Sequence, residues 1–277
     1  AGGLREAMKL DPVQLHKGDK VYVVLETTVG KIRFDPVKDS DGVKRIHILS
    51  RLWILLKSSK KDCYTKNMKK LIFFDLDGTL TTHNTWYDFN LFFGMSEQED
   101  QTLLDWYKRG IISYSEWDEL IVKVLRDRNQ CTKQRVAEFL STAVPRSEAR
   151  DVIAACKEKG YLSIILSGTM RQIAEHFKNE LGADFSYTTS EIIFDDNGDF
   201  IGITNDKDEG PAKLRIFEKL CSEHGVDPTD TICVGDSRND LEMFMRTKKA
   251  ILIGDYAPLK DHAWKQIQGL DELKEIL

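Results

Sequence analysis

The chain has little cysteine and no long hydrophobic run. Its 277 residues include five cysteines, an odd number, and none of them forms a Cys-x-x-Cys pair. This argues against a disulfide framework and against a zinc site of the usual spacing. No apolar stretch approaches the roughly 18–20 residues that a membrane span needs, and no signal-peptide pattern begins the chain. We therefore expect a cytoplasmic protein without a membrane span.

The overall composition is that of an ordinary globular protein. Hydrophobic residues make up 41% of the chain and charged residues 31%, and the net charge is −5. A chain of this length is long for one domain and comfortable for two, with enough residues for a sizeable core. The composition therefore predicts a folded protein and leaves its function to the motifs.

The first quarter of the chain, residues 1–67, predicts a small and mostly β module. Residues 20–26 are rich in β-branched side chains and predict a strand, and residues 31–34 alternate and predict its hairpin partner. Residues 43–49 alternate again. Residues 52–56 are apolar and predict either a further strand or a short helix.

A basic segment joins this module to the rest of the chain. Residues 43–70 contain nine lysines and arginines against one acid, Asp62. Such a segment is either a solvated linker or a surface for an anionic partner such as nucleic acid, and both interpretations stay open. Met68 is followed by Lys-Lys-Leu, which is typical of a natural start, so we place the domain boundary there, with a catalytic unit over 68–277.

Two aspartates one residue apart follow an apolar run. Residues 71–74 predict a strand buried on both faces, as in a parallel sheet, and Asp75 and Asp77 come directly after it. Ligands of open α/β sheets bind at this end of a strand. Two carboxylates so close repel each other unless a cation lies between them or one is protonated, which predicts Mg²⁺ and an acid/base pair. The alternative is a helix-capping aspartate beside a turn aspartate.

Three further segments carry polar side chains in a comparable setting. Residues 164–169 predict a buried strand that ends in Ser-Gly-Thr. Residues 210–213, Gly-Pro-Ala-Lys, predict the start of a helix that carries Lys213, although a surface lysine is the alternative. Residues 232–240 predict another buried strand, which runs into Gly-Asp-Ser-Arg-Asn-Asp.

With Asp-Leu-Asp-Gly-Thr at 75–79, these segments resemble, in order, the four motifs of the haloacid dehalogenase superfamily of phosphatases. The resemblance covers 68–277 and implies an α/β fold with a doubly wound, Rossmann-like parallel sheet. Residues 83–145 have helical periodicity and resemble the helical cap of this superfamily, inserted after the first motif. We take most of the cap's aromatic residues as its core. The layout is similar to the phosphoserine phosphatase-like branch.

The resemblance implies a role for each motif residue. Asp75 would be the nucleophile that forms an aspartyl-phosphate, and Asp77 would be the general acid and then the base. Mg²⁺ would be held by Asp75, Asp236 and the backbone carbonyl of Asp77, and Asp240 would orient a water on the metal. The phosphoryl group would be bound by four residues: Ser167, Gly168, Lys213 and Asn239.

Two positions depart from the pattern of phosphoserine phosphatases. That branch has a glutamate for the substrate ammonium where this chain has Asn84, and a cap arginine for the substrate carboxylate where this chain has Glu119. A site without that charged pair discriminates weakly for a zwitterion. The expected function is therefore Mg²⁺-dependent hydrolysis of another small phosphate monoester, with His83, Asn84 and Trp86 as candidates to line its pocket. The competing function is a binding or regulatory protein whose basic N-terminal module recognises nucleic acid or another anionic partner.

Overall fold

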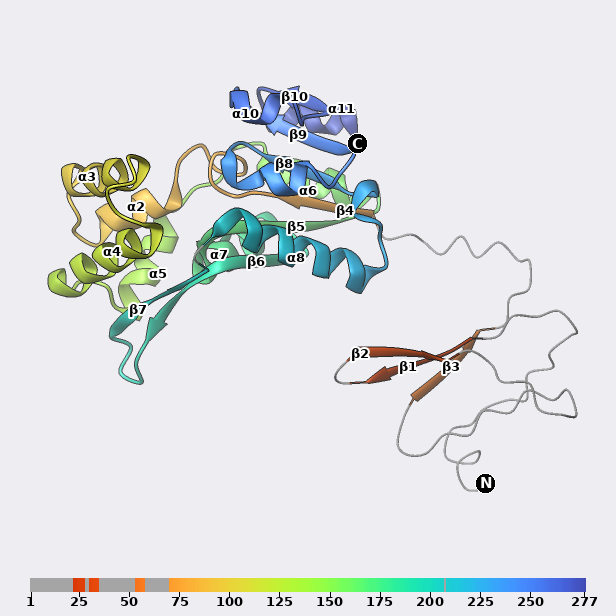
Figure 1. The fold of residues 1–277 in the computed structure, drawn as a ribbon, viewed down its shortest axis with the longest axis horizontal. Coiled ribbons are helices and arrows are strands. Elements are labelled where there is room, and N and C mark those ends of the chain that lie inside the picture. Colours follow the sequence, from red (N-terminus) through yellow and green to blue (C-terminus); the bar gives the residue numbers. More distant parts are fainter. Residues whose placement is uncertain (1–21, 28–29, 35–52, 58–69, 207) are drawn as a thin grey trace, which may run out of the picture. The chain divides into compact units, whose positions relative to one another are not determined.

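The chain divides into two compact units. The computed structural model describes residues 22–27, 30–34, 53–57, 70–206 and 208–277 (Figure 1). The two units are Ala1–Asn67 and Met68–Leu277.

The described part of the first unit is a three-stranded antiparallel sheet. Strand β1 (Tyr22–Thr27) lies in the middle and pairs with β2 (Gly30–Phe34) on one edge and β3 (Trp53–Lys57) on the other. The predicted hairpin is therefore present, and the segment predicted as a strand or a helix is a strand. The predicted strand over 43–49 and most of the basic segment 43–70 lie outside the described residues, so the anionic partner stays a prediction.

The second unit is built on a seven-stranded sheet in the order β10-β9-β8-β4-β5-β6-β7. All neighbouring strands are parallel except β6 and β7, which form an antiparallel hairpin. This order, with β4 at the centre, is that of the predicted α/β fold. The strands are β4 (Lys70–Phe74), β5 (Tyr161–Met170), β6 (Phe185–Phe194), β7 (Phe200–Asn205), β8 (Ile232–Gly235), β9 (Lys249–Ile253) and β10 (Lys265–Ile267).

Helices cover both faces of this sheet (Figure 1). Leu71 and Phe73 of β4 pack into a core with residues of α8 and α9, whereas Ile72 and Phe74 pack into a second core with residues of α6 and α7. Alternate side chains of β4 thus enter opposite cores, which explains its uninterrupted apolar sequence. The helices are α6 (Ala149–Glu158), α7 (Arg171–Leu181), α8 (Glu209–His224), α9 (Leu241–Phe244), α10 (Ala257–Lys260) and α11 (Leu273–Ile276).

Four helices between β4 and α6 form the cap predicted over 83–145, and they lie together at one end of the unit (Figure 1). Two of them begin with a capping box, in which Ser96 pairs with Glu99 and Ser113 with Glu116. Buried aromatic rings form part of the cap core, as predicted for most of its aromatic residues. The helices are α2 (Thr85–Phe92), α3 (Glu97–Lys108), α4 (Tyr114–Arg128) and α5 (Lys133–Thr142).

The hairpin of β6 and β7 connects the sheet to the cap. Asn205 Nδ2 donates to Tyr114 Oη over 2.9 Å, and the Arg126 guanidinium donates to the carbonyl of Ile201. The first residues of β6 pair in parallel with β5, and its residues from Ser190 onward pair antiparallel with β7. These contacts fix the position of helix α4 relative to the end of the sheet.

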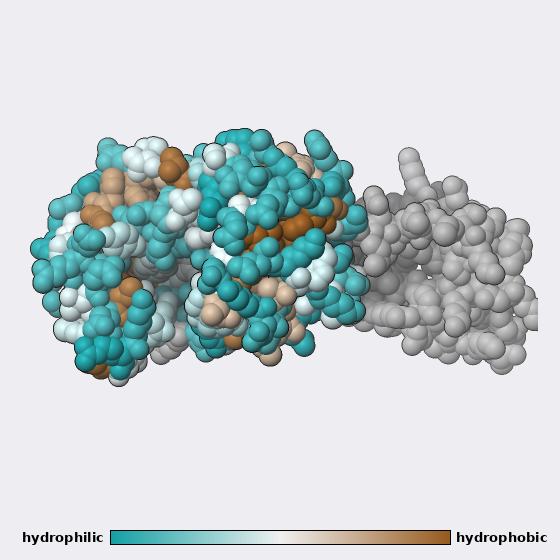
Figure 2. Space-filling model, turned by 90° about the horizontal axis from the view of Figure 1, so that it is seen from above, coloured by the Kyte–Doolittle hydropathy of each residue, from teal (hydrophilic) through white to brown (hydrophobic). Residues whose placement is uncertain are grey.

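The face in Figure 2 is mainly hydrophilic, with small hydrophobic patches. In the described ranges, no helix has both the length and the apolar character needed to cross a membrane. The cysteines described there are buried and free of disulfides: Cys131, Cys156, Cys221 and Cys233.

The domain boundary at residues 67 and 68 is a prediction that truncation tests. We expect residues 68–277 to fold alone, because all four motifs and both cores belong to the second unit. Thermal unfolding of 68–277 should be cooperative, with a Tm within a few degrees of that of the same unit in the full chain. Insoluble protein, or a broad transition, would show that the first unit is needed for the stability of the second.

Candidate active site

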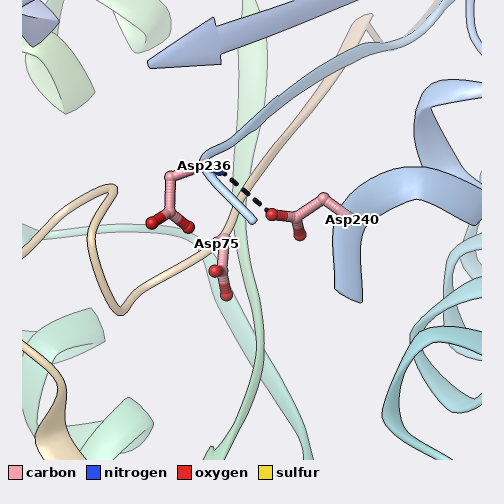
Figure 3. Close-up of side chains that lie close together, drawn as sticks. All are labelled: Asp75, Asp236 and Asp240. Carbon is pink, nitrogen blue, oxygen red and sulfur yellow. Dashed lines mark hydrogen bonds between the residues drawn. The ribbon is translucent and has the colours of Figure 1, made fainter. Parts of the chain in front are cut away.

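Three parallel strands bring the motif residues together at one end of the sheet. Asp75 follows β4, Asp236 follows β8, and Ser167 lies near the end of β5. The amide of Asp75 donates to the carbonyl of Val234 over 2.9 Å, which fixes the first two strand ends relative to each other. Figure 3 shows the carboxylates of Asp75 and Asp236 in this place, together with Asp240 from the turn that follows β8. The strand topology therefore gathers residues that are far apart in the sequence.

A buried lysine links these acids. Lys213, on the second turn of α8, is fully buried, so the surface-lysine alternative is wrong. Its Nζ lies 2.8 Å from Asp75 Oδ1, 3.1 Å from Asp240 Oδ1 and 3.8 Å from Glu209 Oε1. Burial alone would lower the pKa of Lys213, but these three acids outweigh it and raise that pKa above its usual value. The ammonium therefore stays charged next to Asp75.

Asp240 holds the loop that carries Asp236. Its Oδ2 accepts a hydrogen bond from the amide of Asp236 at 3.1 Å (Figure 3). The same oxygen accepts from the amide of Ser237 at 3.3 Å. Its other oxygen accepts from Lys213. With both oxygens engaged by donors, Asp240 is suited to position the loop and the lysine.

Asp77 has features of both alternatives that the sequence leaves open, a helix-capping aspartate and an acid/base residue. Its Oδ1 accepts a hydrogen bond from the amide of Thr85 at 3.1 Å, so it binds the first turn of α2 as a capping aspartate would. It also lines the same cavity as Asp75. Burial, and then the charge of Asp75, raise the pKa of Asp77 to about 7. A carboxyl group in this environment can hold a proton near neutral pH.

Ser167 and Gly168 lie within β5, which runs to Met170, one residue beyond the predicted Ser-Gly-Thr end. The strand continues because β6 pairs with it on both sides of a register shift between Ser167 and Met170. The Gly168 carbonyl accepts from Trp86 Nε1 at 3.3 Å and from Ser190 Oγ at 3.0 Å. The irregular segment is thus held by α2 of the cap and by β6.

A cavity of about 320 Å³, here called the inner cavity, lies between these groups. His83, Asn84 and Trp86 line it, as the sequence predicts. Glu119, which the sequence places at the position of a substrate-binding arginine, is exposed and does not line it. The motif residues that line the inner cavity are Asp75, Asp77, Gly78, Ser167, Gly168, Asp236, Ser237 and Asn239.

The acids at this site suit a divalent cation. Carboxylate oxygens of Asp75, Asp236 and Asp240 lie within 4.8 Å of one another. In the described part of the chain, Asp236 Oδ1 is buried without a hydrogen-bond donor, and the ion pairs of the site acids all go to Lys213. Burial, and then the charge of Asp75, raise the pKa of Asp236. Oxygen ligands with surplus negative charge are what Mg²⁺ prefers, so the residues present fit this ion.

One acid of the site was missed by the sequence analysis. Glu209 lines the inner cavity, and Asn239 Nδ2 donates to its Oε1 at 2.5 Å. Burial raises the pKa of Glu209. Its spacing from Lys213 was the available signal, because residues four apart share a helix face, but a helix beginning before residue 210 was not predicted.

Gly78 permits the approach of Asp236 to the first motif. Its φ is +76°, and a Cβ at this position would lie 2.0 Å from Asp236 Oδ2. We expect Gly78→Ala to lose about 1–2 kcal/mol of unfolding free energy from the left-handed backbone and about 1–3 kcal/mol more from overpacking. Urea unfolding measures this loss.

Gly160→Ala is the matched control, because Gly160 also has a positive φ, +79°, but a Cβ there meets nothing within 4 Å. It should show the backbone loss alone. Equal losses for the two variants would mean that Asp236 moves aside freely, which would contradict a fixed carboxylate at this place.

Known proteins resemble the chain over a large part of its length. The chain matches the haloacid dehalogenase-like hydrolase family over residues 72–245. A phosphoserine phosphatase of Methanocaldococcus jannaschii is 28% identical over 211 residues, which are 76% of this chain and 96% of that protein. One of Wolinella succinogenes is 25% identical over 209 residues, which are 75% of this chain and 98% of that protein.

Solved structures agree with this. A phospho-aspartyl intermediate analogue of a phosphoserine phosphatase matches with a TM-score of 0.64 and 26% identity, covering 76% of this chain and 99% of that one. A substrate-bound phosphoserine phosphatase complex matches with a TM-score of 0.64 and 25% identity, covering 76% and 98%. The chain therefore belongs to the haloacid dehalogenase-like hydrolase family, as a hydrolase similar to its phosphoserine phosphatases.

Proposed function

We propose that the protein is a Mg²⁺-dependent phosphate monoester hydrolase that forms an aspartyl-phosphate at Asp75 on a small phosphorylated metabolite. The observation that carries the proposal is the pair of Asp75 and Lys213. A buried carboxylate lines the inner cavity while a buried ammonium 2.8 Å away supplies positive charge. Phosphoryl transfer depends on such positioned charge around the transferred group.

The reaction would proceed in two steps. One oxygen of Asp75 attacks the phosphorus, the bond from phosphorus to the alcohol oxygen breaks, and that oxygen takes the proton of Asp77. In the second step Asp77 accepts a proton from water as the water oxygen attacks the phosphorus, which releases phosphate and the free Asp75 carboxylate. The pKa of Asp77, raised to about 7, suits a group that gives and takes a proton near neutral pH.

The other residues of the site would hold the phosphoryl group and the metal. The hydroxyl of Ser167, the backbone at Gly168, the Lys213 ammonium and the amide of Asn239 would bind the phosphoryl oxygens. Asp75, Asp236 and the carbonyl of Asp77 would hold Mg²⁺, which neutralises charge on Asp75 and the phosphoryl group. Asp240 would keep Asp236 and Lys213 in position, in keeping with the donors that its two oxygens accept.

Phosphoserine is the first substrate to test, because the relatives named above are phosphoserine phosphatases. Asn84 stands where a glutamate would bind the ammonium of that substrate, and its Oδ1 accepts the amide of Tyr87 as the cap of α2. This oxygen is therefore already engaged. The residues of the site therefore support phosphatase activity more strongly than they support phosphoserine as the substrate.

Removal of the metal is the direct test of the cofactor. Hydrolysis of an aryl phosphate should fall to background in excess EDTA and return when Mg²⁺ is added in excess, because Asp75 and Asp236 would otherwise repel each other and the substrate phosphate. The rate of phosphate release with and without chelator measures this. Full activity in excess chelator would overturn the metal assignment.

A further inference from the structure

A second and larger cavity adjoins the phosphate site. Its volume is about 860 Å³, and we call it the outer cavity. It shares five lining residues with the inner cavity: Asn84, Trp86, Glu209, Ser237 and Asn239. A phosphate ester bound at Asp75 would therefore have the outer cavity as the nearest enclosed space for its alcohol part.

The cap side of the outer cavity is aromatic. Tyr107 of α3 stacks on Trp117 of α4, with ring centroids 5.7 Å apart and planes at 23°. Tyr114 lies against both rings, at 5.7 Å from Tyr107 and 5.5 Å from Trp117. Trp86, which lines both cavities, has its ring 6.4 Å from that of Trp117. These rings line the cavity, and Trp86 and Trp117 also pack against the cap core, so they are among the minority of cap aromatics with a free surface for substrate.

The charges around the outer cavity favour a cation. The acidic residues in its lining are Asp100, Asp208, Glu209 and Glu242, and the basic ones are Lys108 and Arg238. Arg238 is exposed and 3.1 Å from Glu242 Oε1, and Lys108 is exposed at the end of α3. Glu209 is the acid at the junction of the two cavities.

We propose that the outer cavity binds the alcohol part of the substrate, and that this part carries an ammonium group and no carboxylate, as in a phosphorylated amino alcohol. Aromatic faces attract cations, quaternary ammonium included. Acids at the same place add to this attraction, and Glu119, at the position that carries an arginine in phosphoserine phosphatases, is exposed and lines neither cavity. The inference rests on the proposed phosphatase function and specifies its substrate class.

The test compares esters that differ in one charge. Phosphocholine and 3,3-dimethylbutyl phosphate have the same shape, but only the first is cationic at its far end. We expect kcat/KM for phosphocholine to be at least about tenfold higher, and kcat/KM for phosphoethanolamine to be at least equal to that for phosphoserine. Equal kcat/KM values for phosphocholine and 3,3-dimethylbutyl phosphate would overturn the claim that the cavity recognises a cation. A strong preference for phosphoserine over phosphoethanolamine would overturn the claim that the substrate has no carboxylate.

Variants locate the effect in the outer cavity. Tyr107→Leu removes an aromatic face and should reduce the preference for phosphocholine several-fold, whereas Tyr107→Phe keeps the ring and should retain the preference. Trp106→Leu is the matched control, because Trp106 is the exposed neighbour on α3 and does not line this cavity. An unchanged preference in Tyr107→Leu would overturn the assignment to these rings.

A binding measurement separates this inference from the catalytic proposal. Tryptophan fluorescence of the full chain should respond to choline at lower concentration than to its neutral isostere 3,3-dimethylbutanol, whether or not any ester is hydrolysed. Choline binding without hydrolysis of any ester, aryl phosphate included, would overturn the phosphatase and keep the cation site. Hydrolysis of aryl phosphate, with choline and 3,3-dimethylbutanol binding at equal concentrations, would keep the phosphatase proposal and overturn the cation site.

Discussion

Asp75→Asn is expected to abolish turnover, with a loss in kcat of about 10⁴-fold or more, the scale found when an enzyme loses its nucleophile. An amide cannot attack phosphorus to give the acyl-phosphate, and it carries no charge to pair with the Lys213 ammonium, which lies 2.8 Å from Asp75 Oδ1. Phosphate release from an aryl phosphate in excess Mg²⁺ measures the loss.

Asp196→Asn is the matched control, because this aspartate is exposed in the turn between β6 and β7. It should keep the activity of the parent chain. Circular dichroism of Asp75→Asn should match that of the parent, so that inactivity is not a failure to fold. Turnover near the parental rate in Asp75→Asn would exclude the covalent mechanism.

Lys213→Met is expected to lower both stability and activity. The side chain is fully buried and forms ion pairs with Asp75 and Asp240, which are themselves buried. Removing one partner from a buried ionic network costs about 3–5 kcal/mol, since the remaining charges stay desolvated and unpaired. The Tm should fall on the order of 10 °C, as thermal unfolding in the presence of EDTA would measure.

Lys219→Met is the control from the same helix, because Lys219 is 71% exposed and its Nζ lies 4.0 Å from Glu223 Oε1. Exposed pairs of this kind contribute little, so no clear shift in Tm is expected. If Lys213→Met unfolded at the temperature of Lys219→Met, the network around Asp75 would not be the stabilising element that the distances indicate.

The parts of this fold that the sequence predicts are those in which local pattern and final environment agree. Residues 71–74 are apolar because both faces of β4 are buried, and Asp75 follows because the chain leaves the sheet there. The same logic applies to β8 and Asp236. Parallel neighbours must place such strand ends side by side, so the inner cavity is largely predictable from the four motifs.

The parts that the sequence does not predict depend on packing between distant segments. Tyr107 and Trp117 have the spacing of ordinary core aromatics, and only the arrangement of α3 and α4 places them on a cavity wall. Nothing in the local sequence distinguishes Glu209 from the other acids, because its place beside Lys213 depends on α8 beginning at Glu209. The register shift between Ser167 and Met170 of β5 arises in its pairing with β6, which no local pattern encodes.

The central claim is that Asp75 carries the phosphoryl group between substrate and water, and a rapid acid quench tests it most directly. The full chain would be mixed with Mg²⁺ and an aryl phosphate, quenched within one turnover, digested and analysed by mass spectrometry. The account predicts the mass of one phosphoryl group on the peptide that contains Asp75, sensitive to hydroxylamine as an acyl-phosphate is, and absent from Asp75→Asn. Phosphate release at the full rate without any phosphoryl group on that peptide, or with the group on Ser167, would contradict it.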